Sequence, residues 1–215
     1  MKLTWLGHAS VQLLIGNRFV YVDPVVDPFQ LWQFPKAELI LLSSTAPDHF
    51  SEECVRELLG DVGVVYGPSD AGRFLQVNAA QEREVYDVGF CTVKTMPANP
   101  VRKDKARSIG FLLRGEGKTV YYSGDTKYIA EMEGLCPDVL LIPIGGTYSV
   151  SAQEAASWLV RIKPKIVIPI HWGRNEGTLD DAYRFIREAP VLYQNRIRIL
   201  QEGESINVDE VLKTF

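Results

Sequence analysis

The residues of this chain that are best suited to chemistry are its three histidines, His8, His49 and His171, and the aspartates near them. Asp48 directly precedes His49, and Asp125 closes a Ser-Gly-Asp segment that follows an apolar stretch. Imidazole nitrogens and carboxylate oxygens together suit Zn²⁺, Fe²⁺ or Mn²⁺. Such an ion lowers the pKa of its bound water or polarises a carbonyl or phosphoryl oxygen. Any metal site in this chain must use three imidazoles or fewer.

These polar residues recur at one kind of position, the end of an apolar segment that has the length of a strand. In α/β sheets, ligands gather at the carboxyl ends of strands, where loops carry the functional side chains. Segments 2–6, 18–22, 39–42, 118–122 and 166–170 each run into such a residue. The sequence therefore predicts that one rim of the molecule holds His8, Asp23, Asp48, His49, Asp125 and His171.

The elements that must position this rim follow from the apolar periodicity of the chain. The first third favours strands, two of them joined by the turn-forming pair Gly16-Asn17. The second half alternates helices and strands, and Ser151 with Glu154 forms a capping box for one helix. Further strands are predicted over 63–66, 109–114 and 139–143, and helices over 51–60, 71–75, 128–133, 151–162 and 178–188. This order indicates one α/β domain over residues 1–215.

Three of the polar segments resemble metal-binding motifs of a known family. Asp48-His49, Ser123-Gly124-Asp125-Thr126 and Pro169-Ile170-His171 resemble the second, third and last motifs of hydrolases with the metallo-β-lactamase fold. The resemblance follows the family order and covers nearly the whole chain. It implies a four-layer αββα sandwich with one site at the edge of the sandwich.

Other segments narrow this resemblance to one branch of the family. Gly7-His8-Ala9-Ser10, Asp23-Pro24 and residues 142–148 resemble small metal-dependent hydrolases that are related to L-ascorbate-6-phosphate lactonases. The resemblance implies that Asp48, His49, Asp125 and His171 hold one divalent ion, Zn²⁺, Mn²⁺ or Fe²⁺. It also implies that Asp48 and His8 act in catalysis, and that Asp23, Ser44 and Thr126 support the ligands from behind.

The chain departs from the family at the first metal site. The family loop has the form Thr-His-x-His-x-Asp-His, but Ser44 and Ala46 stand where two of its histidines would be. Asn99 follows Pro97-Ala98, where the third histidine of that site is expected. Residues 50–170 contain no histidine, so no shift of alignment restores the first site. We therefore expect no two-metal centre.

Each candidate residue also has a purely structural interpretation. Asp48-His49 can form a loop turn, and Asp125 can cap the helix predicted after it. His8 and His171 can be hydrogen-bonded core histidines, and Asp23 can belong to a turn before Pro24. Two hypotheses therefore stand. The first is a metal-dependent hydrolase acting on a small ester, lactone or phosphodiester. The second is a catalytically inactive homologue that binds no metal and serves as a small-molecule binding or protein-interaction module.

Composition limits the partners of the chain. Its net charge is −4, from 23 basic and 27 acidic side chains, so we expect no nucleic-acid partner. Its cysteines, Cys54, Cys91 and Cys136, lack a paired spacing, which favours a reducing, cytoplasmic location over a disulfide framework. No apolar run is long enough for a membrane span. We expect a small-molecule substrate or ligand, and a homo-oligomer remains an alternative to a monomer.

Three further segments have open interpretations. Residues 27–35 are unusually apolar for a connection between strands, and we expect them to pack into the core; a wall of a substrate cleft or a subunit contact is the alternative. The basic run Arg102, Lys103, Lys105 and Arg107 is interpreted as a solvated loop. Gly145-Gly146 lacks the spacing of a phosphate-binding loop and is predicted to serve a backbone turn.

Overall fold

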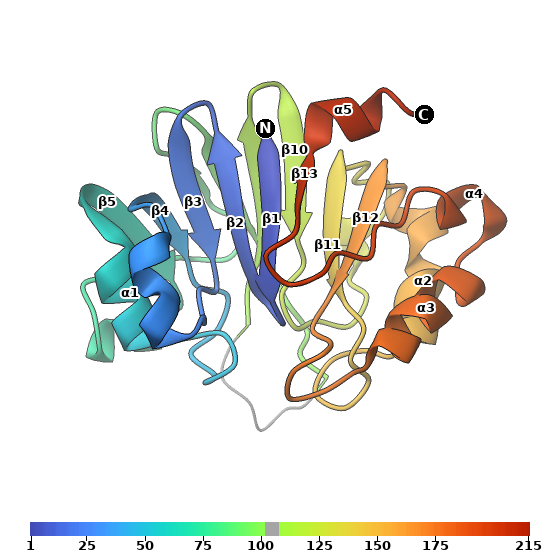
Figure 1. Ribbon diagram of the computed structural model, residues 1–215, viewed down its shortest axis with the longest axis horizontal. Coiled ribbons are helices and arrows are strands. Elements are labelled where there is room, and N and C mark those ends of the chain that lie inside the picture. Colours follow the sequence, from blue (N-terminus) through green and yellow to red (C-terminus); the bar gives the residue numbers. More distant parts are fainter. Residues whose placement is uncertain (102–107) are drawn as a thin grey trace.

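The computed structural model describes residues 1–101 and 108–215 of the chain, so the basic run Arg102, Lys103, Lys105 and Arg107 lies outside the described residues. Two mixed sheets pack face to face, with α1 on the outer face of one sheet and α2 and α3 on the outer face of the other (Figure 1). The molecule is a four-layer αββα sandwich, as the sequence predicts.

The first sheet has seven strands in the order β13-β1-β2-β3-β4-β5-β6. Its strands are β1 (Lys2–Gly7), β2 (Ser10–Ile15), β3 (Arg18–Val22), β4 (Ala37–Leu41), β5 (Leu59–Gly67), β6 (Asn78–Ala79) and β13 (Ser205–Asn207). Strands β1, β2 and β3 pair antiparallel, whereas β4 pairs parallel to β3. The carboxyl ends of β1, β3 and β4 therefore meet at one edge of the sheet, the lower edge in Figure 1.

The second sheet has six strands in the order β12-β11-β10-β9-β8-β7. Its strands are β7 (Val85–Asp87), β8 (Thr92–Met96), β9 (Gly110–Gly115), β10 (Lys118–Tyr122), β11 (Val139–Pro143) and β12 (Ile166–Ile170). Strands β10, β11 and β12 are parallel, so their carboxyl ends also share one edge. Both edges lie on the same side of the sandwich (Figure 1).

Apolar side chains fill the layers on both sides of each sheet. Between the sheets, Leu13 and Val20 face Phe111 and Val120, and all four are fully buried. A second cluster joins the outer face of the first sheet to α1, through residues such as Val55. Burial of this kind contributes about 25 cal/mol for each Å² of apolar surface, so the sheets hold their edges rigidly and fix the loops that leave them.

The helices are α1 (Glu52–Leu58), α2 (Ala152–Ile162), α3 (Leu179–Glu188), α4 (Val191–Gln194) and α5 (Val208–Leu212). Ser51 caps α1, and the predicted capping box of Ser151 and Glu154 begins α2. Thr178 and Asp181 form a second capping box on α3. None of the described helices combines the length and the apolar composition needed to cross a bilayer.

The predicted helix over 128–133 is wrong, because only one 3₁₀ turn forms there, η3 (Ala130–Met132). The aromatic ring of Tyr128 packs on Trp158 and under the Arg161 guanidinium, so this segment lies against α2 instead of continuing as a helix. The predicted helix over 71–75 is likewise a 3₁₀ turn, η2 (Ser69–Arg73). Helix α1 ends at Leu58, two residues before Gly60, because β5 begins at Leu59.

The apolar connection after β3 differs from its prediction. It contains the 3₁₀ helix η1 (Pro28–Gln33), in which Leu31 is buried as expected. Phe29 and Trp32, however, are 88% and 82% exposed, so the prediction that they pack into the core is wrong. A 3₁₀ helix has about three residues per turn, and one buried stripe cannot cover its whole circumference.

The cysteines give a simple test of this fold. Cys54 and Cys91 are buried, and burial raises the pKa of the Cys91 thiol to about 12, whereas Cys136 is exposed. Because the thiolate is the reactive form, we expect a thiol reagent to modify Cys136 alone in the native protein. All three thiols should react after unfolding. Labelling with a chromogenic disulfide, compared between native and guanidinium-treated protein, measures this; rapid native modification of Cys91 would contradict the fold.

Candidate metal centre

The carboxyl ends of five strands bring the predicted residues together at the shared edge of the sandwich. His8 follows β1, Asp23 follows β3, Asp125 follows β10 and His171 follows β12. Asp48 and His49 lie in a turn after β4, closed by the His49 backbone N–H donating to the Ala46 carbonyl at 2.9 Å. Five of these six side chains converge on one buried centre, and Asp23 lies behind them.

Asp23 orients His49 from behind. The Nδ1–H of His49 donates to Asp23 Oδ2 at 2.7 Å, and both side chains are buried. The same carboxylate accepts hydrogen bonds from the Tyr122 hydroxyl at 2.7 Å and from the Ser43 backbone N–H at 2.6 Å, as well as one from the Ser43 hydroxyl. These bonds fix the tautomer of His49, so that its Nε2 presents a lone pair to the centre.

Glu176 orients His171 in the same way. Its Oε1 accepts a hydrogen bond from His171 Nδ1, and its Oε2 accepts from the backbone N–H groups of Thr147 and Tyr148 at 2.8 and 2.6 Å. Burial alone would raise the pKa of Glu176, but these donors lower it to about 2, so it stays a carboxylate. Gly145 allows this approach, because a Cβ at that position would overlap the Glu176 side chain.

Two imidazole nitrogens face each other across the centre. His49 Nε2 and His171 Nε2 are 3.0 Å apart. The carboxylate of Asp125 lies beside both, with Oδ2 at 3.2 Å from His49 Nε2 and Oδ1 at 3.3 Å from His171 Nε2. Asp48 Oδ2 is more distant, at 3.9 and 3.7 Å from the same nitrogens. All four side chains therefore point into one small volume.

This arrangement fits a bound cation. Because both Nδ1 atoms carry their protons toward carboxylates, two lone pairs meet at Nε2 and repel each other unless a positive charge lies between them. Donors bonded to one ion at about 2.1 Å lie about 3.0 to 3.4 Å apart, and the separations among His49, Asp125 and His171 have these values. Asp125 Oδ1 accepts no hydrogen bond from the described residues although it is buried. These three residues and Asp48 could hold a divalent metal ion.

The pKa shifts of His49 and Asp125 indicate which charges this cluster of side chains favours. Burial opposes the charged form of His49, but the carboxylates of Asp125 and Asp23 outweigh it and raise its pKa well above the ordinary value. Burial would raise the pKa of Asp125, but His49 and His171 lower it to about 2. The surrounding carboxylates thus stabilise positive charge between the two imidazoles.

His8 lies at the side of this cluster. Its Nε2 is 3.5 Å from Asp48 Oδ2, and its ring centre is 3.8 Å from that of His171. Burial, as the largest influence, lowers the pKa of His8, so its imidazole is neutral at pH 7. The backbone of His8 has a φ of 50°, in the left-handed region, as do Asp23 at 46° and His171 at 64°. Non-glycine residues adopt this conformation infrequently.

Ser44 and Thr126, the other two residues predicted to support the ligands, have local partners. The Ser44 hydroxyl accepts from the Ala46 backbone N–H at 3.2 Å, within the turn that carries Asp48. The Thr126 hydroxyl accepts from the Asn99 backbone N–H at 2.8 Å. Thr126 thus ties the loop after β10 to the segment where the family has its third histidine. The interpretation of Asp125 as a helix cap is wrong, because no helix begins there among the described residues.

Glu176 and Tyr122 contact this cluster of side chains and were not among the residues that the sequence indicated. Glu176 is five positions after His171 in a glycine-flanked loop, and only the folding back of that loop brings the two side chains together. Tyr122 ends β10 and looks like any apolar strand residue in sequence. The one available signal was a single acidic residue between Gly173 and Gly177, close to a candidate ligand.

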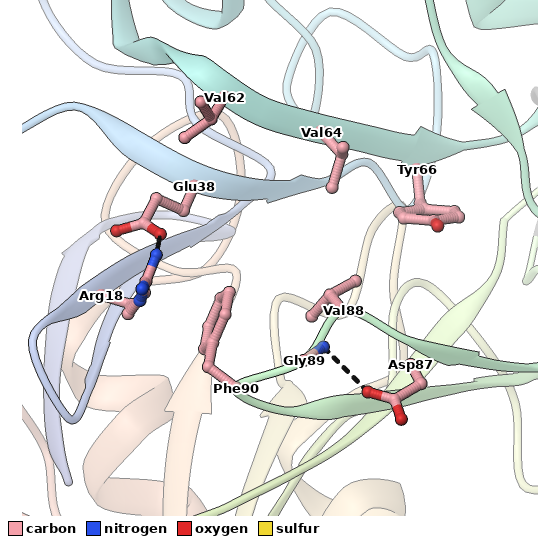
Figure 2. Close-up of a pocket in the computed structure, with 9 residues that line it drawn as sticks. All are labelled: Arg18, Glu38, Val62, Val64, Tyr66, Asp87, Val88, Gly89 and Phe90. Carbon is pink, nitrogen blue, oxygen red and sulfur yellow. Dashed lines mark hydrogen bonds and ion pairs between the residues drawn. The ribbon is translucent and has the colours of Figure 1, made fainter.

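Two cavities of several hundred Å³ open on the protein surface, and one of these two adjoins this centre. A cavity of about 390 Å³ is lined by His8 together with Trp5, Trp172, Arg174 and Tyr183, among others. A cavity of about 540 Å³ lies elsewhere, between Val64 and Tyr66 of β5 and the turn that carries Val88 and Phe90 (Figure 2). None of the five converging side chains, those of His8, Asp48, His49, Asp125 and His171, lines this second cavity.

Comparison with known proteins shows which proteins resemble this chain. A family model of the beta-lactamase superfamily domain matches residues 2–171. The UPF0173 metal-dependent hydrolase of Methanoregula boonei is 31% identical over 225 residues, and the match covers 97% of this chain and 98% of the relative. The UPF0173 metal-dependent hydrolase of Sulfurisphaera tokodaii is 28% identical, with coverages of 96% and 99%.

Solved structures of low sequence identity share the fold. Igni18, a metallo hydrolase from Ignicoccus hospitalis, aligns with a TM-score of 0.80 at 22% identity, covering 95% of this chain and 97% of that one. An isothiocyanate hydrolase from Delia radicum gut bacteria aligns with a TM-score of 0.77 at 15% identity, covering 96% and 99%. These alignments confirm the metallo-β-lactamase fold that the sequence motifs indicated.

The buried carboxylate of Asp23 generates a stability prediction. We expect Asp23→Asn to lower the free energy of unfolding by about 2 kcal/mol or more, because the amide cannot accept all the bonds from His49, Tyr122 and Ser43. Asn tolerates the left-handed backbone at this position, so strain does not explain the loss. Asp27→Asn is the matched control, since Asp27 only caps η1 and Asn caps equally well. Urea unfolding of both variants measures the difference, and equal stabilities would contradict this role of Asp23.

Proposed function

The chain belongs to the beta-lactamase superfamily, and within it to the UPF0173 metal-dependent hydrolases, and from this premise we propose that it hydrolyses a small ester, lactone or phosphodiester. One divalent ion, Zn²⁺, Mn²⁺ or Fe²⁺, is held by Asp48, His49, Asp125 and His171. The observation that carries this proposal is the 3.0 Å approach of two imidazole lone pairs beside a carboxylate. A positive charge between the two nitrogens would stabilise that approach.

The residues around this centre divide the work of the reaction. A bound ion would lower the pKa of a water molecule and polarise the substrate oxygen. Asp23 and Glu176 hold the two imidazoles in place, so the ligands need no rearrangement during the reaction. Asp48 is the most exposed of the four proposed ligands, with 13% of its side chain accessible, whereas His49 and His171 are nearly closed to solvent. Asp48 is therefore placed to accept the proton of the attacking water.

The cavity beside His8 supports a small-molecule substrate. Its volume of about 390 Å³ lies within the range of small-ligand pockets, and its walls are aromatic and apolar with a few charged groups. Trp5 and Trp172 stack at 4.7 Å between ring centres, which gives the cavity a rigid floor. The Arg174 guanidinium pairs with Glu202 at the opening. A substrate with an apolar group would place its reacting bond next to His8 and Asp48.

Metal content tests the proposal directly. We expect untagged protein, purified without chelator, to contain close to one divalent ion per chain. The variant with both Asp48→Ala and His171→Ala should contain almost none, because it keeps only one carboxylate and one imidazole of the set. Elemental analysis of both proteins measures this. A parent protein that stays metal-free after incubation with Zn²⁺, Mn²⁺ and Fe²⁺ would reject the hydrolase proposal in favour of a catalytically inactive binding module.

The support that Glu176 gives to His171 yields a graded prediction. Glu176→Gln keeps the size of the side chain but removes the charge that holds the His171 tautomer, so metal affinity should fall by about 10- to 100-fold. Glu188→Gln, on the exposed end of α3, is the matched control and should leave affinity unchanged. Competition against a fluorescent chelator gives both dissociation constants. Equal affinities would show that Glu176 has no part in holding the ion.

A further inference from the structure

His8 is a buried histidine whose ring nitrogens lack hydrogen-bond partners in the described part of the chain. The residue is 4% exposed, yet neither ring nitrogen has a hydrogen-bond partner among the described residues. Buried polar atoms normally find partners, and a histidine with two unsatisfied nitrogens is a rare exception.

Two hydrogen bonds hold the main chain of His8 beside the proposed metal ligands. Its carbonyl accepts from the His171 backbone N–H at 2.8 Å and from the Trp5 indole N–H at 3.0 Å. The bond from His171 links the carboxyl ends of β1 and β12, which belong to different sheets. They also hold His8 in the left-handed conformation, at a φ of 50°. Backbone strain of this kind persists where the surrounding structure over-determines it.

The imidazole of His8 lies near two of the four proposed ligands, Asp48 and His171. Donor atoms of His8, Asp48 and His171 all lie within 4.8 Å of one another, as do those of His49, Asp125 and His171. His171 belongs to both groups, so the group that contains His8 adjoins the group that contains His49.

We propose that His8 is an additional ligand of the ion held by Asp48, His49, Asp125 and His171, so that all three histidines of the chain bind one metal. This inference rests on the proposed function, since it concerns the same centre. It explains the orphaned nitrogens of His8, because a metal ion would be the missing partner of one of them.

The chemistry of the enlarged donor set favours particular ions. Three imidazole nitrogens and two carboxylate oxygens make five protein donors, and one position remains for water or substrate. Zn²⁺ most often takes four ligands, whereas sites of mixed nitrogen and oxygen donors with five or six ligands suit Mn²⁺ and Fe²⁺.

Removal of the imidazole from His8 tests this role without reference to enzyme activity. We expect His8→Gly to weaken Mn²⁺ and Zn²⁺ binding by at least about 10-fold in chelator competition. Glycine adopts a positive φ without strain, so the backbone is preserved. Added imidazole should restore much of the affinity in His8→Gly by entering the space that the side chain left. X-ray absorption of the metal-loaded proteins should show three imidazoles in the parent and two in His8→Gly.

Two controls separate a ligand from a structural residue. Lys163→Gly relieves the same left-handed backbone, at a φ of 59°, at the end of α2 and away from the centre, and it should leave metal affinity unchanged. His8→Asn tolerates the backbone but leaves no space for free imidazole, so its weaker binding should not be rescued. Circular dichroism and thermal unfolding check that each variant is folded.

The possible failures have different meanings. If the parent protein binds none of the ions, both the proposed function and the role of His8 are wrong. If the parent binds one ion and folded His8→Gly binds it equally well, only the role of His8 is wrong. A loss of affinity that imidazole does not reverse, with an unchanged count of imidazoles in X-ray absorption, would also overturn the role of His8, because that residue would then only position others.

Discussion

The architecture of this centre depends on two hydrogen bonds outside the group of proposed ligand atoms, one donated by His49 Nδ1 to Asp23 and one donated by His171 Nδ1 to Glu176. Each bond assigns a proton to Nδ1 and so decides that Nε2 has a free lone pair. If either carboxylate were absent, a ring could rotate or exchange its tautomer, and the 3.0 Å approach of the two nitrogens would relax. Much of the surrounding structure serves to hold these two carboxylates in place.

The fold supplies that support from both sheets. Asp23 leaves β3 of the first sheet and is held by Tyr122, the last residue of β10 in the second. Glu176 belongs to a loop after β12 and is held by backbone N–H groups after β11. The centre therefore joins the two halves of the sandwich at one edge, where the core residue Tyr122 reaches Asp23. Packing of the sheets and geometry of the site are two aspects of one arrangement.

The parts of the fold and of the site that have a periodic or motif signal could be predicted from the sequence. Strand ends placed His8, Asp23, Asp125 and His171 on one rim, since apolar segments of strand length are easily identified. Glu176 could not be predicted in this way. Its contact with His171 depends on a loop that folds back over five residues, and no local sequence pattern encodes the path of that loop. The helix expected at 128–133 failed for a related reason, since contacts of Tyr128 with α2 outweighed the local preference.

The left-handed backbone at His8, Asp23 and His171 limits how this protein can evolve. At an ordinary helical or extended position, a lost ligand can drift to almost any residue. Here Gly, Asn and Asp are the residues that accept the backbone at little cost, and β-branched residues are strongly disfavoured. A descendant that loses these side chains should therefore keep glycine, asparagine or aspartate at the three positions, because the backbone conformation continues to select for them.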